Sequence, residues 1–167
     1  FSAETFCLHH RCAFSRVAHR AAIAAPGHGH PQPPLTASGW ARWNGSIAQQ
    51  NRYGIFVSGG GSNLIGGTSA NTGNVISGNS EGIRLEATSN NQVLGNFLGT
   101  DATGLAAVGN SVGVSVGGPS SSNNNIIGGA TAGARNVISG NNGFGIYLTP
   151  RANGNQVLGN YIGTSAN

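Results

Sequence analysis

The sequence of 167 residues predicts an all-β protein that winds as a parallel β-helix of about four turns, here called rungs. Two observations carry this prediction. The hexapeptide Asn-Val-Ile-Ser-Gly-Asn at 74–79 returns 62 residues later at 136–141, and Asn-Gln-Val-Leu-Gly-Asn at 91–96 returns at 155–160. A shorter motif, glycine followed by alternating apolar residues, recurs every 28–32 residues. Self-similarity at a fixed period is typical of stacked repeat architectures.

Each rung is expected to begin with this glycine motif, because apolar residues alternate with variable ones as they do in a half-buried strand. One set of side chains should stack inward on the next rung, and the other should point outward. The predicted first strands are 54–57, 82–85, 113–116 and 145–148. The expected inward residues are Ile55, Ile83, Val114 and Ile146, beside Val57, Leu85, Val116 and Leu148. The expected outward residues are Phe56, Arg84, Ser115 and Tyr147.

Two more short strands follow in every rung, and the Gly, Asn, Ser and Thr between them suit turns and left-handed conformations. The predicted second strands are 63–66, 91–95, 125–128 and 155–159, with Ile65, Val93, Ile127 and Val157 inward. The predicted third strands are 74–77, 96–99, 136–139 and 160–163, with Ile76, Leu98, Ile138 and Ile162 inward. An asparagine three residues before each first-strand glycine predicts a ladder of stacked amides, made of Asn51, Asn79, Asn110 and Asn142.

The repeated segments also resemble a known family. Asn-x-Ile-x-Gly-Asn and Gly-Ile-x-Leu, with Leu-Gly-Thr-Asp-Ala-Thr-Gly at 98–104, are similar to the right-handed parallel β-helix repeat proteins of bacteria over residues 44–167. Pectate lyases, polygalacturonases, alginate epimerases and many large secreted or surface proteins share that fold. The resemblance implies a right-handed helix, an extracellular or cell-surface location, and a polysaccharide or cell-surface glycan as partner. It implies no particular activity, because one fold supports many functions.

Residues 1–43 do not repeat and form a separate N-terminal segment in this prediction. They hold Cys7, Cys12, all five histidines and a charge of +3 out of the chain's net +4. Two interpretations are open: a disordered linker, since 26–34 is rich in proline, glycine and histidine, or a stretch translated from the wrong frame. The cysteines and histidines are suitable metal ligands, but their spacing fits no closed zinc module.

The sequence also argues against a signal peptide, a membrane span and nucleic-acid binding. The apolar run 21–25 is shorter than the core of a signal peptide, and no segment approaches the ~20 apolar residues of a membrane span. The basic residues gather in the N-terminal segment without an aromatic–basic binding motif, which argues against nucleic acid as a partner. The patterns specify no cofactor and no oligomeric state.

The candidate site is a patch on the outward face of the second rung. Glu81 and Glu86 are expected at opposite ends of one first strand, flanking Arg84, which could pair with the carboxylate of a uronic acid. Phe56 and Tyr147 should lie on the same face, one and two rungs away, where aromatic rings suit sugar stacking. These five residues form a candidate glycan-contact face. Asp101 lies in a predicted Asx turn, and no metal site is expected there.

No catalytic set is expected among these residues. Glycosidases need two placed carboxylates, and the outward first-strand positions hold none. The repeat contains no histidine for a Ser-His-Asp arrangement. The sequence therefore favours a structural and adhesive segment of a larger exported bacterial protein. The alternative is part of a polysaccharide-active lyase, hydrolase or epimerase whose catalytic rungs lie outside these residues. An ice-binding solenoid is disfavoured, because no strand carries a threonine column.

Overall fold

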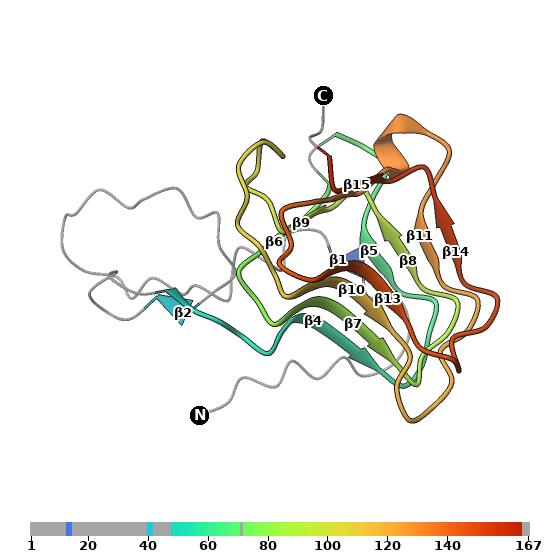
Figure 1. The fold of residues 1–167 in the computed structure, drawn as a ribbon. Helices are drawn as coiled ribbons and strands as arrows, with labels where there is room; N and C mark the ends of the chain where they lie inside the picture. Colours follow the sequence, from blue (N-terminus) through green and yellow to red (C-terminus); the bar gives the residue numbers. More distant parts are fainter. Residues whose placement is uncertain (1–12, 15–39, 42–47, 71, 165–167) are drawn as a thin grey trace.

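A computed structural model describes residues 13–14, 40–41, 48–70 and 72–164. It confirms the parallel β-helix: the chain makes about four turns, and the first, second and third strands of successive turns form three separate parallel sheets (Figure 1). The described residues contain no α-helix, and their one helical turn is the 3-10 helix η2 (Ala132–Ala134). Because each strand lies over its counterpart one turn away, residues about thirty positions apart in sequence become neighbours.

The first strands form a sheet in the order β13-β10-β7-β4. Their bounds are β4 (Tyr53–Ser58), β7 (Glu81–Glu86), β10 (Val112–Val116) and β13 (Phe144–Leu148). Ile83 pairs with Ile55 on one side and with Val114 on the other, and Val114 pairs with Ile146. The predicted inward column is therefore confirmed in register.

The second and third strands form the other two sides of the solenoid. The second strands are β5 (Leu64–Gly66), β8 (Gln92–Leu94), β11 (Ile126–Gly128) and β14 (Gln156–Leu158). The third strands are β6 (Val75–Ile76), β9 (Phe97–Leu98), β12 (Val137–Ile138) and β15 (Tyr161–Ile162). Their registers join the two predicted inward columns, Ile65, Val93, Ile127 and Val157, and Ile76, Leu98, Ile138 and Ile162.

Among the described residues, three short strands precede the first full rung. β1 (Ala13–Phe14) pairs in parallel with β5, and β2 (Trp40–Ala41) pairs in antiparallel fashion with β3 (Ala48–Gln49). Two of these strands belong to the segment 1–43 that the sequence treats as non-repeating. Cys7, Cys12 and the five histidines, the metal-ligand types noted in the sequence, lie outside the described residues.

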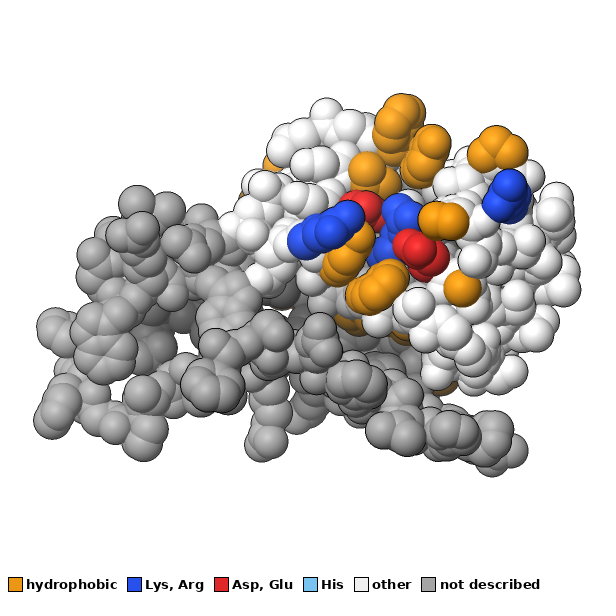
Figure 2. Space-filling view, turned by 90° about the horizontal axis from the view of Figure 1, so that it is seen from below, with side chains coloured by type: hydrophobic (Ala, Val, Ile, Leu, Met, Phe, Trp, Pro, Cys, Tyr) orange, Lys and Arg blue, Asp and Glu red, His pale blue; other side chains and the backbone are white. Residues whose placement is uncertain are grey.

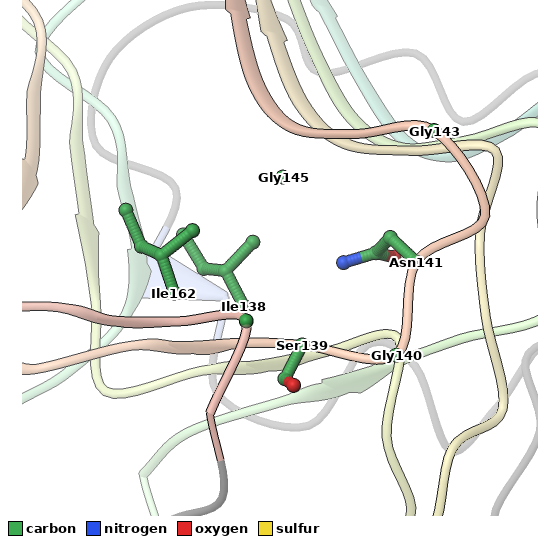
Figure 3. Close-up of a pocket in the computed structure, with 8 residues that line it drawn as sticks. Ile138, Ser139, Gly140, Asn141, Gly143, Gly145 and Ile162 are labelled. Carbon is green, nitrogen blue, oxygen red and sulfur yellow. The ribbon is translucent and has the colours of Figure 1, made fainter.

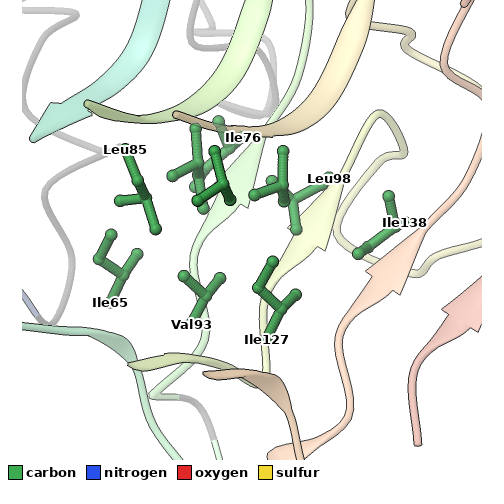
Figure 4. Packing of buried hydrophobic residues seen from close by; sticks show 10 residues of the cluster. Ile65, Ile76, Leu85, Val93, Leu98, Ile127 and Ile138 are labelled. Carbon is green, nitrogen blue, oxygen red and sulfur yellow. The ribbon is translucent and has the colours of Figure 1, made fainter. Parts of the chain in front are cut away.

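The interior is a continuous apolar column made by all three sheets. Ten buried side chains form it (Figure 4): Ile65, Ile76, Ile83, Leu85, Val93, Leu98, Val114, Val116, Ile127 and Ile138. The inward residues of the fourth rung are not buried, however. Leu148, Val157 and Ile162 are 40%, 39% and 47% exposed, because no described strand covers the outer edges of β13, β14 and β15.

Asparagine ladders line the corners of the solenoid, and there are three of them where the sequence predicts one. The predicted ladder runs through Asn51, Asn79 and Asn110 but ends on Asn141, not on Asn142. Asn142 is exposed and only its backbone N–H reaches Asn110. The other two ladders precede the second and third strands: Asn63, Asn91, Asn125 and Asn155, and Asn74, Asn96, Asn136 and Asn160.

All three ladders have the same polarity. The Oδ1 atom of one rung accepts from the side-chain Nδ2 of the preceding rung, and in most steps from its backbone N–H as well. The Nδ2 atom also donates to carbonyl groups of the strand corner, as Asn136 does to the carbonyl of Val93. Buried backbone groups need such partners at the turns, where the sheets end. The ladders therefore provide hydrogen-bond partners for backbone groups at the corners, where neighbouring strands cannot.

The glycine of the first-strand motif is explained by close contact between rungs. A Cβ atom on Gly82 would lie 2.6 Å from the carbonyl oxygen of Gly113, and one on Gly113 would lie 2.5 Å from that of Gly145. Both distances are shorter than real Cβ contacts. Only glycine therefore lets successive first strands approach this closely where the third-strand residues Leu98 and Ile138 pack beneath them.

Candidate functional site

The five residues of the candidate glycan-contact face lie on the outer surface of the first-strand sheet. Phe56 pairs with Arg84 across the strands, Arg84 with Ser115, and Ser115 with Tyr147, so the predicted outward column is in register. Phe56 and Tyr147 are 48% and 43% exposed. Figure 2, seen from the side of this sheet, shows basic and acidic side chains together with hydrophobic side chains around them.

A compact ion cluster occupies the second rung. Arg84 donates through Nη1 to Oε2 of Glu81 at 3.1 Å. It also donates to Oε2 of Glu86, through Nη2 at 3.0 Å and through Nε at 3.2 Å. Nη1 also donates to the hydroxyl of Ser115 at 3.1 Å. Ser115 was expected to face solvent, but it is buried because the guanidinium of Arg84 lies over it. The cluster therefore joins the second rung to the third.

The turn after β10 closes over one side of this cluster. A Cβ atom on Gly118 would lie 3.0 Å from Nη2 of Arg84 and 3.0 Å from the carboxyl carbon of Glu86. The backbone of this glycine is thus packed directly against the ion pair. Arg84 is held between two carboxylates, a hydroxyl and a backbone turn, and its side chain is only 16% exposed.

The surroundings of Arg84 fix its charge. Burial lowers the pKa of the guanidinium, but hydrogen bonds to Glu81 and Glu86 and the charges of both carboxylates raise it, and the net shift is upward. Arg84 therefore stays protonated at any pH at which the protein is folded. Both glutamates are bound to the same cation, Arg84. The guanidinium therefore fixes the position of the two carboxylates.

Replacing Arg84 with methionine should lower the free energy of unfolding by about 1–2 kcal/mol, because two partly buried carboxylates lose their counter-ion. This loss is smaller than that expected for a fully buried ion pair, since the three side chains keep some solvent contact. Urea denaturation measures the change. The triple variant Arg84→Met, Glu81→Gln, Glu86→Gln is the control and should recover most of the loss. A triple variant as unstable as the single one would show that packing, and not charge, dominates.

Two stacked aromatic pairs flank the ion cluster. Tyr53 stacks on Phe56 with ring centres 4.8 Å apart and 21° between the planes, and Phe144 stacks on Tyr147 at 5.4 Å and 29°. The guanidinium of Arg52 lies 5.0 Å from the ring of Tyr53. Sequence reasoning missed Tyr53 and Phe144. The signal was present, because each stands directly before the glycine of its first-strand motif.

Asp101 forms the predicted Asx turn in the loop between β9 and β10. One carboxylate oxygen, Oδ1, accepts the backbone N–H groups of Thr103, Leu105 and Ala106, and the Thr103 hydroxyl donates to both oxygens. Within the described ranges no group of three or more His, Cys, Asp or Glu side chains is arranged to hold a metal ion. This carboxylate therefore organises its own loop.

The pKa of Asp101 should lie below the ordinary aspartate value, chiefly because the Thr103 hydroxyl donates to its charged form. Desolvation opposes this shift, and the backbone N–H groups of Ala106, Leu105 and Thr103 add to it. A lowered folded-state pKa stabilises the loop above the unfolded pKa, and this contribution disappears as pH falls through the folded pKa. An NMR titration should show the Asp101 carboxyl carbon and the Leu105 and Ala106 amides shifting together below the usual midpoint. Asp101→Asn should abolish the shared transition, whereas a carboxyl titrating at about 3.9 would contradict these contacts.

A small hollow of about 110 Å³ lies at the open end of the solenoid (Figure 3). It is lined by Ile138, Gly145 and Ile162 together with polar atoms of Ser139 and Asn141. These residues belong to the core and to the end of the first asparagine ladder. The hollow lies against β15, and its lining contains no ionisable group.

Comparisons with known proteins add no family to this geometry. No protein-family model matches the chain, and comparisons with curated proteins and with solved structures give no significant match. None of the helical segments in the described ranges could span a bilayer.

Proposed function

We propose that this β-solenoid is a structural and adhesive module of an exported protein, acting outside the cell or at its surface, and that it binds a glycan on the outer face of its first-strand sheet. The observation that carries this proposal is the pair of aromatic stacks. Tyr53 with Phe56 and Phe144 with Tyr147 occupy the same two positions of the first strand, at opposite edges of one sheet. Exposed rings on a rigid surface suit the apolar faces of sugars.

The rest of the face supports a binding role over a catalytic one. The two carboxylates nearest the aromatic pairs, Glu81 and Glu86, are tied to the Arg84 guanidinium. A glycosidase needs one carboxylic acid to donate a proton and a second carboxylate to act as base or nucleophile. A cluster in which one cation binds both carboxylates does not resemble that arrangement. The strands meanwhile place the rings on a scaffold built from buried columns and ladders, which suits presentation of a fixed surface.

The test is binding of the protein to a panel of immobilised glycans that includes neutral, acidic and amino sugars. At least one glycan should bind, and Tyr147→Ala should weaken it about tenfold by removing one stacking surface. Leu105→Ala is the matched control, because Leu105 is 59% exposed but belongs to the loop between β9 and β10 and to none of the four first strands. Absence of binding to every glycan, or equal losses in both variants, would refute the proposal.

A further inference from the structure

The outer face of the first-strand sheet carries enough chemistry to select among glycans. Its central cation is Arg84, the residue most suited to bind an acidic sugar. In the structure, however, Nε, Nη1 and Nη2 of Arg84 each already donate to Glu81, Glu86 or Ser115. A uronate carboxylate would have to displace a glutamate from this guanidinium and then lie beside the displaced negative charge. Bidentate capture of an acid by Arg84 is therefore unfavourable.

The charge on this face also favours an uncharged ligand. The ion cluster contains two carboxylates and one guanidinium, so it carries one more negative than positive charge. Arg52, which lies over the Tyr53 ring, balances that charge at the edge of the sheet. The four strands of the sheet contain no charged residue besides Glu81, Arg84 and Glu86. A ligand with a repeating negative charge meets the two glutamates at the centre, and one with a repeating positive charge meets Arg52 and Arg84.

The remaining polar capacity of the cluster is for accepting hydrogen bonds. Glu86 uses Oε2 for both contacts with Arg84, and its Oε1 atom receives no hydrogen bond from the described residues. The side chain of Glu86 is 27% exposed, so this oxygen is accessible. Sugar hydroxyl groups are donors that such an acceptor can bind without any change of charge. The carboxylate therefore matches the hydroxyl groups of a neutral pyranose, and the aromatic rings match its apolar face.

The spacing of the rings sets the direction and length of the ligand. Phe56 and Tyr147 belong to one column of the sheet and are separated by three strand spacings, which amounts to about 14 Å. Between the two rings, no aromatic side chain stands in the column, and Ser115 is buried under Arg84. A single sugar ring is too short to reach both aromatic pairs. A chain of several rings that runs across the strands, along the solenoid axis, reaches both and passes beside the Glu86 carboxylate, which lies against Arg84 of that column.

We infer that the ligand of this face is an uncharged oligosaccharide of several units that lies along the solenoid axis, stacks on Phe56 at one end and on Phe144 and Tyr147 at the other, and donates hydroxyl groups to Glu86. This inference rests on the proposed function, because it names the class of glycan that the same face binds. It replaces the acidic sugar that Arg84 suggests in the sequence.

Calorimetric titration with hexasaccharides of matched length tests the inference. The neutral set contains oligomers of glucose, mannose, galactose and N-acetylglucosamine, and the charged set contains oligogalacturonate and the glucosamine oligomer. At least one neutral oligomer should bind more tightly than both charged ones, with an affinity that hardly changes between low and high salt, because no ion pairs form. Tighter, salt-sensitive binding of a charged oligomer would overturn the inference but leave the adhesive function intact. Binding of none would refute both.

Two variants and a shorter ligand test the bridging geometry. For the neutral hexasaccharide that binds, Phe56→Ala and Tyr147→Ala should each weaken binding about tenfold, because each removes one end of the platform. The disaccharide of the same sugar should bind much more weakly than the hexasaccharide, and Leu105→Ala should leave both affinities unchanged. A disaccharide that binds as tightly as the hexasaccharide, or a ligand sensitive to only one of the two aromatic variants, would show that it does not span the face.

Discussion

Replacing Asn96 with alanine should lower the free energy of unfolding by about 3–5 kcal/mol, because one amide serves several buried partners. The Asn96 side chain is fully buried, and its Oδ1 atom accepts the backbone N–H and the Nδ2 of Asn74 at 3.0 and 2.9 Å. Its Nδ2 atom donates to the carbonyls of Ile65 and Leu94 and to Oδ1 of Asn136. Alanine removes every one of these contacts and leaves their partners on Asn74, Asn136 and Ile65 buried. Each buried group left unsatisfied costs about 1–3 kcal/mol.

The matched control for this experiment is Asn142→Ala. Asn142 is exposed, and its only hydrogen bond with the described residues is made by its backbone. Its replacement should change the free energy of unfolding by less than about 0.5 kcal/mol. Equilibrium denaturation in urea measures both variants, and the slope of the transition shows whether two-state unfolding is kept. Similar losses in the two variants would mean that the ladders do not carry the stability of the corners.

The position of the strands follows directly from the repeat. The alternation of apolar residues after each motif glycine predicts 82–85 as a first strand, and the structure has Glu81–Glu86. The agreement has a physical cause, because every inward residue must lie over its counterpart in the next rung. A shift of one residue would turn Ile83 outward. The repeat therefore constrains register and strand position together, and the remaining error is confined to strand ends.

The end of the first ladder shows what counting from a glycine misses. Asn142 stands three residues before Gly145, as Asn79 stands three before Gly82, yet the ladder passes through Asn141. The fourth rung has one additional residue in this turn. The longer repeat already contained the right alignment, since Ser-Gly-Asn at 77–79 matches Ser-Gly-Asn at 139–141. The preceding glycines also share a left-handed conformation, φ 73° at Gly78 and 69° at Gly140.

The candidate face was less predictable than the core, because it depends on how far long side chains reach. Outward direction alone suggested that Ser115 is exposed, but Arg84 from the neighbouring rung covers it. The aromatic pairs depend on a break in the alternation at the motif glycine. A Cβ atom on Gly54 would meet Ile76, and Ile55 also packs against the core, so Tyr53 and Phe56 emerge on the same side although they are three residues apart. Alternation of residue types does not encode either effect. Contacts between rungs on the outer surface are set by side-chain length and charge, which vary from rung to rung.

Replacing Ile83 with alanine should lower the free energy of unfolding by about 2–5 kcal/mol. Ile83 is fully buried in the second rung, between Ile55 and Val114 in the same column, and packs within the cluster formed by all three sheets. Rungs on both sides hold the backbone in place, so the cavity left by three missing carbon atoms cannot close. The loss should therefore include the energy of the cavity as well as that of transfer from water.

Ile162→Ala provides the matched comparison, since it removes the same atoms from an inward position of the last rung. Ile162 is 47% exposed, and no described strand lies over it. Its loss should cost less than about 1 kcal/mol, because about half of the side chain already contacts water and no closed cavity forms. Urea denaturation of the two variants under the same conditions measures the difference. The two substitutions remove the same atoms, so the loss in unfolding free energy depends on how deeply each side chain is buried. Equal losses would therefore mean that Ile162 is covered in solution.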